Sequence, residues 1–159
     1  MAEMTQITGG EKLGKSARVG IIASRFNSAI VDAMLQACIE TLRAGGVAEK
    51  DITVIRVPGA FEIPFVARRL ATQGDCEVLI ALGAVVRGET PHFDYIAGQC
   101  ARGVAEVSAD LDVPVIFGVL TTETLPQAAA RAGGQSGNKG ADAARAAIEM
   151  VNVLRALPK

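Results

Sequence analysis

Several residue types are scarce in this chain of 159 residues: tryptophan is absent, and tyrosine and histidine each occur once. The three cysteines, Cys38, Cys76 and Cys100, are far apart and form no CxxC pair. This spacing argues against a disulfide framework or a structural zinc site and suits a reducing compartment. Any stacking on a planar ligand must come from a few phenylalanines or the single tyrosine.

Long apolar segments are missing too, although half of the residues are hydrophobic. No uncharged apolar run approaches the ~20 residues that are needed to span a bilayer. The first residues of the chain lack the apolar core of a signal peptide. We therefore expect a cytoplasmic protein.

Charge of one sign does not dominate the chain. There are 16 Lys and Arg residues against 17 Asp and Glu residues, which gives a net charge of −1, and the two signs are interspersed. We therefore expect neither nucleic acid nor an anionic membrane as a partner. The length favours a single domain with a sizeable core, which we assign to residues 17–159. Residues 1–16 are polar and glycine-rich, which predicts an N-terminal arm.

Strand and helix patterns alternate through this domain. The expected strands are residues 17–24, 51–57, 77–86 and 113–121. The expected helices are 28–44, 61–73, 91–110, 126–133 and 139–157, with Asn27 as the cap of the first helix. Because each strand looks apolar on both faces, the pattern predicts an α/β protein with right-handed crossovers. The form expected is a flavodoxin-like three-layer αβα sandwich with a four-stranded parallel sheet.

Ligands of such sheets bind at the carboxyl ends of the strands, and the loops there hold most of the polar, glycine and aromatic exceptions to the apolar pattern. Phe26 follows the first strand, either as a packing residue or as a ring stacked on a planar heterocycle. Glu62 follows the second strand, either as a helix-start carboxylate or as an acceptor for ligand hydroxyl and N–H groups. The convergence of these loops predicts a ligand site.

The most informative segment is GAVVRGETPHFDY at residues 83–95, which contains the only histidine. It predicts a buried strand, a glycine-bearing loop and a helix start, with Thr90 as N-cap and Pro91 as first helical residue. Such a helix start favours an anion, and Gly88 lets the backbone approach a ligand closely. His92 in the first helical turn is either structural or a proton shuttle, and its position favours the shuttle.

The segment GGQSGNKG at residues 133–140 resembles a phosphate-binding loop only superficially. It lacks the G-x-x-x-x-G-K-[ST] spacing, and no strand leads into it. The dinucleotide fingerprint GxGxxG is missing as well. Arg131 and Lys139 flank this segment, either as solvated surface cations or as groups that close over an anion.

Five segments together resemble the lumazine synthase family: RFN at 25–27, VPGAFEIP at 57–64, GAVVRGETPHFDY at 83–95, VIFGVLTTE at 115–123 and GNKG at 137–140. They follow the family order and spacing across residues 17–155. The resemblance implies a transferase that condenses 5-amino-6-(D-ribitylamino)uracil with 3,4-dihydroxy-2-butanone 4-phosphate. Its products would be 6,7-dimethyl-8-ribityllumazine and phosphate, in the penultimate step of riboflavin biosynthesis.

The resemblance also implies a role for each candidate residue. The ring and ribityl chain of the first substrate would be contacted by Phe26, Ala60, Phe61, Glu62, Ala84, Val85, Val86 and a neighbouring subunit's Phe117. The butanone phosphate would be held by Glu89, Thr90, Lys139 and a neighbouring Arg131. His92 and Arg131 would be the catalytic groups, with His92 transferring protons and Asp142 as a candidate to orient it. The substrate supplies its own amine, so no metal or other cofactor is implied.

Members of this family assemble as pentamers with sites between subunits, and some build sixty-subunit icosahedral shells. The segment between Arg131 and Asn138 is short, as in the shell-forming members, which favours a shell. The N-terminal arm would add a strand to a neighbour's sheet, and riboflavin synthase is a candidate partner.

Two other functions stay open: a non-catalytic binder of flavin or lumazine on the same scaffold, and an electron carrier that uses FMN. A binder would need neither His92 nor the pair Arg131 and Lys139, so their presence favours the enzyme. The scarcity of tryptophan and tyrosine disfavours the electron carrier.

Overall fold

The computed structural model describes residues 3–158, so Met1, Ala2 and Lys159, which the predicted arm and domain include, lie outside the described residues. Its elements are, in chain order, β1 (Val19–Ser24), α1 (Ser28–Ala44), the 3-10 turn η1 (Glu49–Asp51), β2 (Ile52–Val57), the 3-10 turn η2 (Ala60–Glu62), α2 (Ile63–Gln73), β3 (Val78–Val86), α3 (His92–Leu111), β4 (Val115–Thr122), α4 (Leu125–Ala130), β5 (Ala132–Gly134), β6 (Gly137–Asn138) and α5 (Lys139–Ala156).

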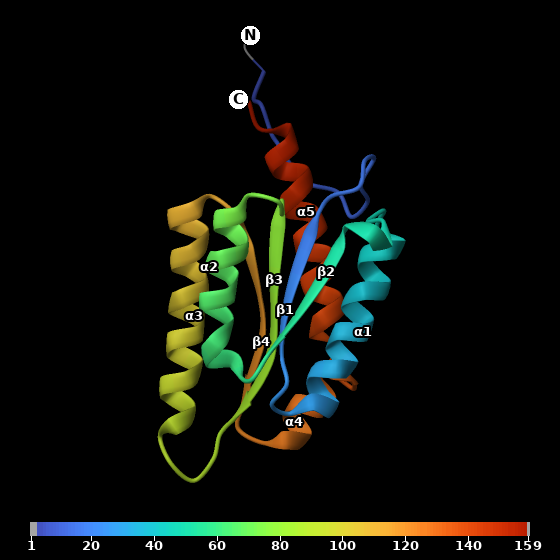
Figure 1. Cartoon of the computed structure of the whole chain (residues 1–159). Coiled ribbons are helices and arrows are strands. Elements are labelled where there is room, and N and C mark those ends of the chain that lie inside the picture. Colours follow the sequence, from blue (N-terminus) through green and yellow to red (C-terminus); the bar gives the residue numbers. More distant parts are fainter. Residues whose placement is uncertain (1–2, 159) are drawn as a thin grey trace.

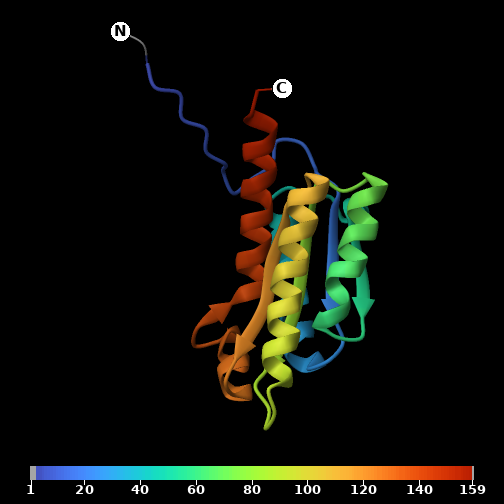
Figure 2. The ribbon, with the colours of Figure 1, turned by 90° about the vertical axis from the view of Figure 1, so that its left-hand side faces the viewer.

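The main sheet has four parallel strands in the order β2-β1-β3-β4. Helices α1 and α5 cover one face, and α2 and α3 cover the other (Figures 1 and 2). The chain reverses its direction across the sheet after β2, and its helices change face at the same step, as right-handed crossovers require. This arrangement confirms the predicted three-layer α/β sandwich of the flavodoxin-like type.

One hydrophobic core lies on each face of the sheet, and the two central strands, β1 and β3, contribute side chains to both. Every residue of β1 is buried, as is β3 up to Val85. Alternate side chains of these strands point to opposite faces, so Ile21 and Ile80 pack against α1 and α5 while Ile22 and Leu79 pack against α2 and α3. Burial on both faces explains the near-continuous apolar runs in the sequence.

The prediction that each strand is apolar and buried on both faces is wrong for the two edge strands. In β2, Thr53, Val54 and Arg56 are exposed, and in β4 the side chain of Phe117 is 43% exposed. An edge strand has a neighbour on one side only, so its outer residues are less covered than those of a central strand. Among the described residues, β2 pairs only with β1, so no strand lies along its outer backbone edge.

Local corrections concern helix starts and one missed hairpin. Asn27 does not cap α1 with its side chain; it adopts a left-handed conformation (φ 60°), which Asn tolerates well. The short helix ends at Ala130 rather than at residue 133, because the chain turns into the antiparallel hairpin β5–β6. Helix α2 begins at Ile63, after the 3-10 turn η2.

Residues 10–16 lie along α5 and are tied to it by side chains of that helix. The Nδ2 of Asn152 donates to the carbonyls of Gly10 and Lys12, both at 2.9 Å. Arg155 donates to the carbonyls of Lys15 at 2.7 Å and Ser16 at 2.9 Å. The division into an arm of residues 1–16 and a single domain of residues 17–159 stays a prediction. Within residues 3–158, no helix has the length and apolar character that crossing a membrane requires.

Candidate active site at the carboxyl ends of the strands

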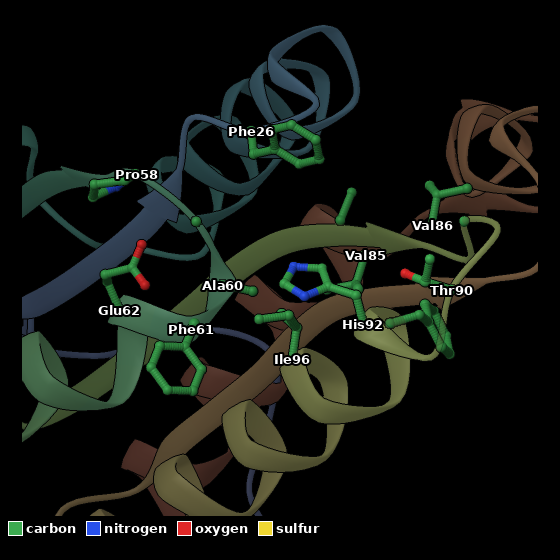
Figure 3. Close-up of a pocket in the computed structure, with 14 residues that line it drawn as sticks. Phe26, Pro58, Ala60, Phe61, Glu62, Val85, Val86, Thr90, His92 and Ile96 are labelled. Carbon is green, nitrogen blue, oxygen red and sulfur yellow. The ribbon is translucent and has the colours of Figure 1, made fainter.

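A cavity of about 580 Å³ lies at the carboxyl ends of β1, β2 and β3, beside the start of α3 (Figure 3). We call it the main cavity; it is lined by Phe26, Pro58, Gly59, Ala60, Phe61, Glu62, Ala84, Val85, Val86, Gly88, Thr90, His92, Phe93 and Ile96. The lining is mostly apolar with a few polar groups, which is typical of a site for an organic ligand. The cavity lies at the carboxyl ends of the strands, where ligands of parallel α/β sheets are expected to bind.

The aromatic wall of the main cavity comes from loops that backbone hydrogen bonds hold in place. The amide of Arg25 donates to the Val57 carbonyl at 2.8 Å, and the amide of Phe26 donates to the Pro58 carbonyl at 3.1 Å. The Nδ2 of Asn27 donates to the Ala84 carbonyl at 2.9 Å, which joins this loop to β3. The Phe26 side chain is 71% exposed, so it contributes little to the core and is free to face a ligand.

Glu62 is half-buried in the 3-10 turn between β2 and α2, and its carboxylate lies beside Ala60 and Phe61 (Figure 3). Its side chain makes no capping hydrogen bond to α2, so helix capping does not use the carboxylate. The carboxylate lies close to the Gly59 backbone, where an added Cβ would be 3.5 Å from Oε1 of Glu62, an ordinary contact distance. A carboxylate in this position can accept hydrogen bonds from a ligand in the cavity.

The start of α3 differs from the prediction. The helix begins at His92, Pro91 is its N-cap, and Thr90 makes no side-chain capping bond, so the assignment of Thr90 as N-cap and Pro91 as first helical residue is wrong. The Pro91 backbone has φ −70° and ψ 6°, and this ψ lies outside the α-helical region, so the regular helix starts one residue later. The Thr90 side chain instead lines the main cavity together with Gly88, near the positive end of the helix dipole.

His92 is exposed, and its imidazole lies in the cavity between Val85 and Ile96 (Figure 3). Among residues 3–158 it takes part in no ion pair. An accessible imidazole beside an anion-favouring helix start can give and take a proton during a reaction in the cavity.

Four further candidates, Phe117, Arg131, Lys139 and Asp142, lie at the edge strand β4. A second cavity of about 460 Å³, which we call the edge cavity, is lined by Ile116, Phe117, Gly118, Val119, Leu120, Thr121, Thr122, Arg131, Lys139, Asp142, Ala143 and Ala146. Arg131 is fixed there by its Nη1, which donates to the Gln127 carbonyl at 2.9 Å. The amide of Lys139 donates to the Arg131 carbonyl at 2.8 Å, so the hairpin β5–β6 places both cations together.

Asp142 lies among cations and not beside His92 of the same chain. Its carboxylate is 3.6 Å from Nζ of Lys139 and 3.1 Å from Nη1 of Arg145. Within one chain it therefore orients Lys139, and any contact with His92 would require another subunit. Asn138 caps α5 by accepting from the amides of Gly140 and Ala141, which fixes the helix start that carries Lys139 and Asp142.

One chain thus brings most of the candidates together and separates the rest. The main cavity contains Phe26, Ala60, Phe61, Glu62, Ala84, Val85, Val86, Thr90 and His92, and the edge cavity contains Phe117, Arg131, Lys139 and Asp142. Glu89 is exposed and lines neither. Sequence reasoning missed Phe93 and Ile96. The offset of four residues from His92 could have indicated Ile96, which lies on the same helix face, whereas no such spacing indicates Phe93.

The fold is thus a flavodoxin-like α/β sandwich with a cavity at the strand ends that contains a histidine, and with two cations at the edge strand. The sequence model of the 6,7-dimethyl-8-ribityllumazine synthase family matches residues 16–155. The chain therefore belongs to this family, and it is a transferase of riboflavin biosynthesis.

Proposed function

We propose that the chain catalyses the condensation of 5-amino-6-(D-ribitylamino)uracil with 3,4-dihydroxy-2-butanone 4-phosphate, the penultimate step of riboflavin biosynthesis. The products are 6,7-dimethyl-8-ribityllumazine, inorganic phosphate and two molecules of water. The observation that carries the proposal is the division of the candidate residues between two cavities of one chain. The main cavity offers aromatic, carboxylate and imidazole groups, and the edge cavity offers the cations that a phosphate needs.

The roles follow from what each wall offers. Phe26 is placed to stack on the pyrimidine ring, and Glu62 accepts hydrogen bonds from the ribityl hydroxyls. Backbone groups of residues 84–86 line the ring pocket, and Thr90, Glu89 and the α3 start receive the phosphate. We assign the Glu89 contribution to its backbone N–H, because Glu89 lies in the loop between Gly88 and Thr90, which both line the main cavity.

The chemistry needs little from the protein besides alignment and proton transfer. The amine of the uracil attacks the ketone carbonyl of the second substrate, and water leaves as the imine forms. Phosphate then leaves, and the ribityl-bearing nitrogen closes the ring with loss of a second water. Alignment of two substrates is worth up to roughly 7–11 kcal/mol, and acid–base help from His92 roughly 3–5 kcal/mol.

The complete site is assembled from two subunits. Phe117 and Arg131 of one chain would cover the main cavity of its neighbour, with Lys139 beside the phosphate. In support, Phe117 is 43% exposed and lines the edge cavity together with Arg131 and Lys139, so it is accessible to a neighbouring subunit. We propose a pentamer, as the family resemblance implies, and a shell of pentamers because the segment from Arg131 to Asn138 is short, as in the shell-forming members. Cytoplasmic localisation and association with riboflavin synthase stay predictions.

The test is to mix the purified protein with both substrates and to follow lumazine fluorescence together with phosphate release. We expect both products to appear in equal amounts and faster than in the spontaneous reaction. Product at the spontaneous rate would contradict the proposal and favour a non-catalytic binder of lumazine.

A further inference from the structure

Arg87 lies outside the main cavity, yet its guanidinium touches segments on two sides of it. Its Nε lies 2.7 Å from Oε2 of Glu123, in the loop that follows β4. Its Nη2 lies 3.3 Å from Oδ1 of Asp94, in the first turn of α3. The same guanidinium stacks on the Phe93 ring at 4.6 Å from its centre.

The backbone of Arg87 adds a further connection. Its amide donates to the Thr122 carbonyl at 2.9 Å, so the end of β3 and the end of β4 are joined at this residue. Thr122 lines the edge cavity, and Phe93 lines the main cavity. Arg87 therefore contacts a residue of each cavity and lies between them.

Within residues 3–158, the start of α3 is held by the partial packing of Phe93 and Ile96 against the core and by Arg87, and not by a side-chain cap. Helices α4 and α5 begin with side-chain caps from Thr124 and Asn138, whereas no side-chain cap is made at the α3 start. His92 is the first residue of this uncapped helix. Phe93 and Asp94, the two residues that follow it, are the ones that Arg87 holds.

We propose that Arg87 is a positioning residue: it clips the first turn of α3 to the loop after β4 and so holds the His92 imidazole in the main cavity. Each ion pair is half-exposed and individually weak. A planar guanidinium that contacts two carboxylates and a ring at once, however, allows only a narrow range of orientations. This inference rests on the proposed proton-transfer role of His92.

The first test is Arg87→Ala, assayed with both substrates. We expect kcat to fall about tenfold, because small misplacements of a reacting group are costly. The KM for the ribitylaminouracil should change less than about twofold, since Phe26 and Glu62 are held by other loops. The control is Arg68→Ala, which removes a 2.9 Å ion pair with Asp110 of similar exposure at the far end of α3; kcat should not change.

The second test asks whether Arg87 acts through His92. In a His92→Ala background, Arg87→Ala should cause no further loss of kcat, because there is no imidazole left to position. A tenfold loss in that background, or a wild-type kcat for the single variant Arg87→Ala, would overturn the proposal. So would a full wild-type kcat for Arg87→Lys, which keeps the charge but lacks the planar fork.

A third measurement does not depend on activity. Hydrogen exchange followed by mass spectrometry should show faster exchange in peptides covering residues 88–97 of Arg87→Ala than of Arg68→Ala. If exchange in these peptides were the same in both variants, the proposal that Arg87 fixes the start of α3 would be overturned, whatever the activity of Arg87→Ala. If the wild-type protein makes no lumazine, the proposed function fails, and the exchange data still decide whether Arg87 holds the start of α3.

Discussion

At the scale of single residues, His92 offers an unusually direct test because no second histidine exists that could replace it. We expect His92→Ala to lower kcat by roughly 10²–10⁴-fold, because general acid–base catalysis typically contributes a rate factor of this size. Turnover should stay measurable, since the alignment of the two substrates by the cavity walls is retained. Steady-state fluorescence assays measure the effect, and wild-type rates in the purified variant would remove His92 from the mechanism.

The cysteines allow a prediction about ionisation. Burial raises the pKa of Cys38 to about 12 and that of Cys100 to about 11, whereas Cys76 is half-buried and its pKa is raised by burial and by Asp75. A raised pKa keeps a thiol neutral and unreactive near pH 8. A disulfide reagent should therefore label Cys76 first and the other two only on unfolding, as mass spectrometry of peptides can check. Early labelling of Cys38 would contradict the core described here.

The same pKa values predict how stability depends on pH. The folded chain keeps protons on Cys38 and Cys100 that the unfolded chain releases above pH 9.0, the ordinary thiol value. The stabilisation is therefore fully present below that pH and is lost as the pH rises towards 11–12. Replacing both residues with alanine should flatten the decline of unfolding free energy over this interval, as denaturant titrations at several pH values would show.

The residues of the main cavity were largely predictable, because each loop that follows a strand breaks the apolar pattern where a ligand is expected. The contacts of Arg87 were not. Its partners Asp94 and Glu123 are 7 and 36 positions away in the sequence. Only the pairing of β3 with β4 brings the second one close, and no local pattern encodes that pairing.

At the scale of elements, strand and helix positions were predicted closely because strong apolar runs mark them. The hairpin β5–β6 was missed, since two strands of three and two residues with several glycines carry no strand pattern. The start of α3 was misplaced because a Thr-Pro pair is typical of a capped helix. In the structure, the Pro91 backbone (ψ 6°) departs from the helical region, so the regular helix begins one residue later.

Two glycines of α3 make a matched pair that tests how α2 and α3 pack. A Cβ at Gly103 would lie 2.5 Å from Cβ of Pro64 in α2, whereas a Cβ at Gly98 would meet no atom within 4 Å. The gain in helix propensity is the same for both alanine variants, so their difference isolates the packing cost. We expect Gly103→Ala to be less stable than Gly98→Ala by about 1–3 kcal/mol in urea titrations at equal protein concentration. Equal stabilities would contradict the close contact of the two helices.

At the scale of the whole molecule, one chain carries two cavities, which we propose to be the two halves of one site. The main cavity holds the imidazole without the cations, and the edge cavity holds the cations without the imidazole. In the head-to-tail ring that we propose, each edge cavity would face the main cavity of the next subunit. At the opposite edge, β2 pairs only with β1 among the described residues, and the addition of a neighbour's N-terminal arm to the sheet stays a prediction.

This arrangement predicts complementation between two inactive variants. We expect His92→Ala and Arg131→Ala to be nearly inactive alone, because each damages every site. In rings formed randomly from equal amounts of both, roughly a quarter of the sites combine an intact main cavity with an intact edge cavity, so about a quarter of wild-type kcat should return. Co-expression with two affinity tags and a fluorescence assay of the doubly purified rings measures it, and the same variants mixed after separate assembly serve as the control. Rings that contain both variants yet show no recovery would mean that each site lies within one chain.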